Sequence, residues 1–146
     1  MANRHQSRES ALEVLYAWHN AGQDDAMVPS LLAGRLSLEE RSSQDQVYLR
    51  EAVLGVIAQV GEIDELIRGA IRGRSLKSVA HIEHNVLRLA IWEMLNRLEI
   101  PYRVIINEAL ELTRSYAGEP ARGFINAVLD NLARKLRPEE TMRSKS

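Results

Sequence analysis

The chain has 146 residues, of which 45% are hydrophobic and 27% are charged, with a formal net charge of −1 and no cysteine. This composition is typical of one globular domain, and it excludes disulfides, thiolate catalysis and zinc sites built on cysteine. No apolar run approaches the ~18 residues of a membrane span and the polar N-terminus lacks the apolar core of a signal peptide, so we expect a cytoplasmic protein without a membrane segment.

The first predicted helix spans Arg8 to His19, where apolar residues recur on one helical face. Cationic side chains crowd its start, at Arg4, His5 and Arg8. The N-terminus of a helix carries a partial positive charge, so each cation there opposes the helix dipole by roughly 0.3–1 kcal/mol. We interpret this cluster as a site for an anion and predict that the anion is RNA.

Tyr16 lies at the edge of the apolar face of this helix, beside Arg8. An aromatic ring close to cations is a candidate for stacking on an RNA base. The alternative is a residue at the edge of the core with its hydroxyl group in water, and the sequence fits both equally well.

The next part of the chain predicts two helices of unequal strength. Residues 23–42 have room for one short helix, because proline, glycine and acidic residues interrupt the pattern. Residues 43–71 keep the 3.6-residue period and predict one long helix, in which Gly55 and Gly61 either weaken the helix or allow close packing. A helix break follows at Gly73.

Three further helices are predicted in the second half. Residues 82–97 are apolar around the whole helix, which is typical of a buried helix. Residues 101–118 form a helix that begins at a proline and ends at a glycine, and residues 120–137 form the last helix. We expect the tail at residues 139–146 to be disordered.

These elements predict an all-α fold of six or seven helices without strands. We expect one domain over residues 1–146, composed of two small helical bundles, residues 3–73 and 74–138, that pack on the buried central helix.

Two charged residues, Arg88 and Glu108, stand in strongly apolar helices. Buried charges require partners, so we predict that these two form a structural ion pair that holds two helices in register. We prefer this interpretation to a catalytic role.

The last helix contains Phe124, the only phenylalanine of the chain, off the axis of the apolar face and two residues after Arg122. Its ring could stack on an unpaired base or pack against a neighbouring helix.

The sequence gives little support for catalysis. His81 and His84, with Glu83 between them, could share a helix face and bind a metal, but no third ligand stands at a suitable spacing. No glycine-rich phosphate loop is present, and the paired carboxylates lie in polar segments where solubility explains them. We therefore predict a binding protein, not an enzyme, with no metal and no cofactor.

Four segments occur in the order and spacing typical of one known family: RESALEVLYAW, IEHNVLRLAIWEML, IPYRVIINEALELTRSYAG and GFINAVLDNLARKLRP. Together they resemble the family of the transcription antitermination factor NusB, over about Arg4 to Pro138. The resemblance implies an all-α fold of about seven helices in two perpendicular three-helix bundles. It also implies binding to boxA single-stranded RNA together with the ribosomal protein NusE, in an antitermination complex with RNA polymerase, and a possible homodimer.

Residue by residue, the resemblance implies RNA contacts at Arg4, His5, Arg8, Tyr16 and Phe124. Arg122 is an RNA-binding candidate because it is a cation two residues before Phe124. Glu83 matches a charged position on the surface that faces NusE. Only two arginines remain of the arginine-rich start that the family often has. This departure supports an alternative function more than it would in a typical relative: a helical protein-interaction scaffold or homodimer with little RNA affinity of its own.

Overall fold

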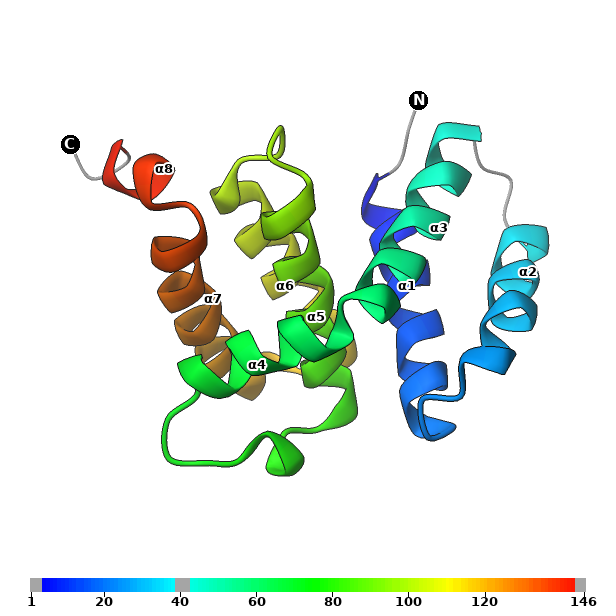
Figure 1. Cartoon of the computed structure of the whole chain (residues 1–146), viewed down its shortest axis with the longest axis horizontal. Coiled ribbons are helices and arrows are strands. Elements are labelled where there is room, and N and C mark those ends of the chain that lie inside the picture. Colours follow the sequence, from blue (N-terminus) through cyan, green and yellow to red (C-terminus); the bar gives the residue numbers. More distant parts are fainter. Residues whose placement is uncertain (1–3, 39–42, 144–146) are drawn as a thin grey trace.

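A computed structural model describes residues 4–38 and 43–143. Within these ranges the chain forms eight α-helices, three short 3-10 helices and no strand, so the all-α prediction is confirmed (Figure 1). The 3-10 helices are Asp25–Met27, Leu76–Ser78 and Glu119–Ala121. The α-helices are α1 (Arg4–Asn20), α2 (Val28–Leu38), α3 (Ser43–Ala58), α4 (Val60–Ala70), α5 (His81–Asn96), α6 (Tyr102–Tyr116), α7 (Arg122–Leu136) and α8 (Pro138–Arg143).

Helix α5 lies at the centre of the fold, as its apolar circumference predicts. All residues from His84 to Met94 are buried. Helices α1 and α3 pack on one side of α5, and α4, α6 and α7 pack on the other (Figure 1). Within the described ranges, none of the helices has the length and apolar character needed to cross a bilayer.

The prediction of one continuous helix over residues 43–71 is wrong at Gln59. Its backbone (φ −111°, ψ 16°) leaves the helical region, so α3 ends at Ala58 and α4 starts at Val60. Helix α3 packs on α1 and α5, whereas α4 packs on α5 and α7. One straight helix could not bury its apolar residues in both places, so the break redirects the chain. The packing of α4 thus places residues 60–70 with the second half of the chain.

Gly55 allows α3 to approach α5 closely. A Cβ atom added at this position would lie 2.1 Å from Nε1 of Trp92. Trp92 is itself buried and packs edge-on against the ring of Tyr48 on α3. The sequence predicts that Gly55 either weakens the helix or allows close packing, and the structure shows close packing.

The expectation of a disordered tail from residue 139 is wrong for residues 139–143, which belong to α8, while residues 144–146 lie outside the described part. Thr141 is buried. An Oε2 atom of Glu140 accepts a hydrogen bond of 2.7 Å from the backbone N–H of Tyr102, the first residue of α6. The guanidinium of Arg137 donates to the carbonyl groups of Glu93, Met94, Arg97 and Ile100 at the end of α5. These polar contacts attach the tail to the core.

Candidate nucleic-acid interface

Carboxylates of the same chain balance part of the positive charge in the first turns of α1. Arg8 is 3% exposed, and its Nε and one terminal nitrogen each donate at 2.9 Å to the carboxylate of Glu93. Its other terminal nitrogen donates at 2.9 Å to Glu108. Although burial opposes it, the hydrogen bonds and charge of Glu93 raise the pKa of Arg8. The prediction that Arg8 meets an RNA phosphate is therefore corrected: its anions are two carboxylates of the same chain.

Arg4 and His5 lie closer to the surface than Arg8. The guanidinium of Arg4 lies 4.0 Å from the ring centroid of Tyr48, a cation–π contact. His5 lies 3.5 Å from a carboxylate oxygen of Glu108, and its side chain is 41% exposed. Neither residue is buried, so this end of α1 keeps cationic side chains open to a ligand.

The predicted ion pair between Arg88 and Glu108 is wrong, because each residue has another partner. Arg88, which is 1% exposed, donates to both carboxylate oxygens of Asp64 on α4, at 2.9 and 2.8 Å. Glu108 pairs with Arg8 at 2.9 Å. Each residue does form an ion pair with another helix, as expected, but with a different partner from the one predicted. The reason is that α5 presents Arg88 toward α4 and not toward α6.

Three histidines lie beside the ion pair of Arg88 and Asp64. The ring of His19, near the end of α1, stacks on that of His81 with centroids 3.7 Å apart and meets His84 edge-on at 5.1 Å. Nδ1 of His19 faces two donors, the amide nitrogen of Asn85 at 2.9 Å and Arg88 at 3.3 Å. Burial, together with the charges of Arg88, His81 and His84, lowers the pKa of His19 to about 4. His19 is therefore held neutral, with Nδ1 as an acceptor.

His81 and His84 hydrogen-bond to protein groups instead of to each other. Nδ1 of His81 lies 2.6 Å from the side-chain oxygen of Asn20, and Nε2 of His84 lies 2.9 Å from Asp64. Although burial opposes it, the hydrogen bonds from Arg88 and His84 lower the pKa of Asp64 below its usual range. In the part of the chain that the structure describes, no group of three or more potential ligands has metal-binding geometry.

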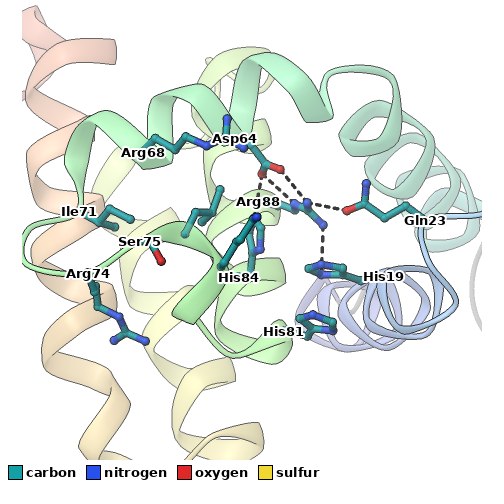
Figure 2. A pocket seen from close by; sticks show the side chains of 12 residues that line it. His19, Gln23, Asp64, Arg68, Ile71, Arg74, Ser75, His81, His84 and Arg88 are labelled. Carbon is teal, nitrogen blue, oxygen red and sulfur yellow. Dashed lines mark hydrogen bonds and ion pairs between the residues drawn. The ribbon is translucent and has the colours of Figure 1, made fainter.

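These groups line a pocket of about 590 Å³ between the end of α1, α4, residues 71–77 and the start of α5 (Figure 2). Figure 2 shows the guanidinium of Arg88 hydrogen-bonded to Asp64, Gln23 and His19. The lining residues are His19, Gln23, Asp64, Arg68, Ile71, Arg74, Ser75, Leu76, Lys77, His81, His84 and Arg88.

The remaining predicted site residues lie near the end of the fold where α5 and α7 begin. Phe124 is half-buried against the core, and the guanidinium of Arg74 lies 4.6 Å from its ring centroid. Arg122 pairs with Glu119 at 3.4 Å with its side chain 41% exposed. Tyr16, also 41% exposed, lies one turn before the end of α1, and Glu83 lies in the first turn of α5.

The predicted residues therefore form two groups at opposite ends of α1. Arg4 and His5 are at its start, whereas Tyr16, Glu83, Arg122 and Phe124 belong to the end of α1 and the starts of α5 and α7 (Figure 1). The stacking of His19 on His81 joins α1 to α5 at this second end, and Arg74 joins the pocket to Phe124.

Sequence reasoning missed three residues that shape the site: Asp64, Glu93 and Arg74. A signal was present for Glu93, since it is a carboxylate within the most apolar helix and requires a cationic partner. Asp64 and Arg74 each stand beside other charged residues along the chain, so only their tertiary neighbours distinguish them from charged surface residues.

An all-α fold centred on a buried helix, with cationic and aromatic side chains at both ends of α1, defines a helical binding module. The chain belongs to the NusB family, whose family model matches residues 5–134. It is 35% identical over 137 residues to the transcription antitermination protein NusB of Sodalis glossinidius, covering 94% of this chain and 96% of that protein. The corresponding protein of Coxiella burnetii (strain Dugway 5J108-111) is 36% identical over 134 residues, covering 92% and 94%.

Solved structures of NusB proteins share the fold. T. maritima NusB matches with a TM-score of 0.84 and 26% identity, covering 98% of this chain and 99% of that chain. A chain in the crystal structure of antitermination factors NusB and NusE in complex with dsRNA matches with a TM-score of 0.76 and 24% identity, covering 90% and 96%. The family consists of non-enzymatic antitermination proteins, which agrees with the prediction of a binding protein and not an enzyme.

Proposed function

We propose that this protein binds boxA-containing single-stranded RNA together with NusE and thereby promotes transcription of ribosomal RNA. The observation that carries the proposal is the placement of Phe124, an aromatic residue that the core does not fully cover, with its ring 4.6 Å from the guanidinium of Arg74. Tyr16, which is 41% exposed near the end of α1, adds a second uncovered aromatic ring. Stacking on aromatic rings and contacts between cations and phosphates are the usual means of binding unpaired RNA.

Arg4 and His5 provide a second contact region in this proposal, and Glu83 faces the protein partner. Arg8 has no direct RNA contact, since its guanidinium is buried among carboxylates. The relation to the crystallised antitermination factors NusB and NusE with dsRNA supports an RNA-linked role. Action in a complex with RNA polymerase, and a cytoplasmic location, belong to the same proposal.

The test is the affinity for a boxA-containing RNA at several salt concentrations, with and without NusE. Arg4→Gln should make the log–log salt dependence shallower by about 0.7, the value for one phosphate contact on a single strand. Tyr16→Ala and Phe124→Leu should weaken binding by about 1–3 kcal/mol each with the salt slope unchanged. Arg114→Gln, an exposed arginine on α6, is the control.

An unchanged slope in Arg4→Gln together with unchanged affinity in Tyr16→Ala would contradict RNA binding at these residues. Equal RNA affinity with and without NusE would contradict joint binding only.

The second candidate function is a protein-interaction scaffold or homodimer. It is favoured by Val47 and Leu54 on α3, which stand seven residues apart on one face and are each 51% exposed. In that case sedimentation would show self-association, and Leu54→Ser would abolish it without altering RNA binding.

A further inference from the structure

The pocket beside α4 carries an excess of positive charge, of which the proposed RNA contacts use only Arg74. Four of its lining side chains are permanent cations, Arg68, Arg74, Lys77 and Arg88, against the single carboxylate of Asp64. Asp64 is already bonded to Arg88 through both of its oxygens. Three cations of the lining therefore have no carboxylate within the pocket.

These three cations are accessible to a ligand. Among the residues that the structure describes, Arg68 forms an ion pair only with Glu65, which lies outside the pocket. The side chains of Arg68 and Glu65 are 54% and 73% exposed, so this pair is weak and readily exchanged. Arg74 donates to the carbonyl oxygen of Ser78 at 3.0 Å and is exposed. Lys77 is exposed and has no ion pair with any residue in the described ranges.

The backbone adds to the positive potential. Helix α5 begins at His81, a residue of the pocket lining, and no side chain caps its first N–H groups. The start of a helix of this length carries a partial positive charge and presents N–H donors to an anion. Arg68 from α4, together with Arg74 and Lys77, thus lines the same pocket as His81, the first residue of α5.

We propose that this pocket binds a phosphate group. Its volume of about 590 Å³ is within the range of small-ligand sites, roughly 300–1,000 Å³. The phosphate could come from an RNA backbone or from a free nucleotide, and the same side chains would contact either. The proposal does not depend on the function proposed above, because a free nucleotide would occupy the pocket without any RNA.

Histidine resonances provide a direct readout, because the chain has four histidines and the pocket lining contains His19, His81 and His84. In a titration of the full chain with inorganic pyrophosphate, we expect saturable shifts of these three imidazole signals. His5, at the start of α1, reports separately on anions bound there. Shifts that rise linearly without saturation would overturn the proposal.

Two charge-removing variants and a matched control make the test specific. Arg68→Gln and Lys77→Gln should each weaken pyrophosphate binding at the pocket by roughly two- to five-fold, the size expected for an exposed charge contact. Arg114→Gln should have no effect: Arg114 is 56% exposed and pairs with a glutamate three residues before it, as Arg68 does. Equal affinity in Arg68→Gln, Lys77→Gln and Arg114→Gln would overturn the proposal.

Competition distinguishes the source of the phosphate. The phosphate belongs to RNA if two results are found. Single-stranded RNA must displace pyrophosphate, and in the double variant Arg68→Gln, Lys77→Gln the log–log salt dependence of RNA affinity must become shallower by about 0.7 for each lost contact. If ATP displaces pyrophosphate and RNA does not, it belongs to a free nucleotide. If neither competes, the proposal is overturned.

Discussion

Arg8 is held by carboxylates from two different helices, which makes it a residue of the core. Its side chain is 4% exposed and that of Glu93 is 2% exposed. Removal of one partner leaves the other charge buried and unpaired, which typically costs ~3–5 kcal/mol. We therefore expect Arg8→Met to lower the free energy of unfolding in urea by about this amount.

The control for this prediction is Arg114→Met, which removes an exposed pair and should cost less than ~1 kcal/mol. If Arg8→Met unfolded at the same urea concentration as the wild-type chain, the burial of the Glu93 carboxylate would not depend on its pairing with Arg8. The double variant Arg8→Met, Glu93→Gln should recover part of the loss, because no uncompensated carboxylate remains at that position.

His19 makes the stability of the fold depend on pH. Its pKa is about 4 in the folded chain, against an ordinary value of about 6.5. Between these values the unfolded chain binds a proton that the folded chain does not, so stability is full above pH ~6.5 and falls on acidification toward pH ~4, by up to about 1.4 kcal/mol per pH unit.

Urea unfolding at pH 7 and pH 5 should therefore show a smaller loss of stability for His19→Gln than for the wild-type chain. His5→Gln, at the other end of α1, leaves His19 in place and should therefore lose as much stability between pH 7 and pH 5 as the wild-type chain. A loss as large in His19→Gln as in the wild type would mean that His19 is already charged in the folded protein.

At the scale of the helices, the contact between α3 and α5 depends on the absence of a side chain at Gly55. Because Trp92 is buried, a methyl group 2.1 Å from its Nε1 atom would force the indole or the helix to move. Overpacking of this kind costs about 1–3 kcal/mol. We expect Gly55→Ala to lower the melting temperature and to change the fluorescence of Trp92.

Gly61 is the matched control, since it lies in α4 and an added Cβ would meet nothing within 4 Å. Gly61→Ala should stabilise the protein by roughly 0.5–1 kcal/mol through helix propensity and reduced chain entropy. Stabilisation by both substitutions would contradict close packing at Gly55.

The helices themselves were largely predictable, because apolar periodicity and glycine or proline stops are local signals. The break at Gln59 was not, since the apolar period continues through it and only the separate packing of α3 and α4 requires it. The partners of Arg88 and Glu108 were also not predictable. Burial of both charges follows from their apolar neighbours along the chain, whereas the choice of carboxylate depends on which helix faces each residue.

At the scale of the whole molecule, the two halves share α5, which packs on α1 and α3 as well as on α4, α6 and α7. Neither half can expose this helix without losing its own core, so we expect one cooperative unfolding transition. Trp18 and Trp92 report on α1 and α5, and circular dichroism reports on all helices. The two signals should give the same midpoint in urea, and a fluorescence transition that precedes the loss of helix would show that the halves unfold separately.

The bonds of Arg8 join residues that are made at different times. Its carboxylate partners stand 85 and 100 residues later in the chain. While the protein is being synthesised, the segment that forms α1 therefore leaves the ribosome long before Glu93 and Glu108 exist. Until they emerge, Arg8 lacks both of the carboxylates that it contacts in the folded protein, and the first helix can take its final place only when most of the polypeptide has been translated.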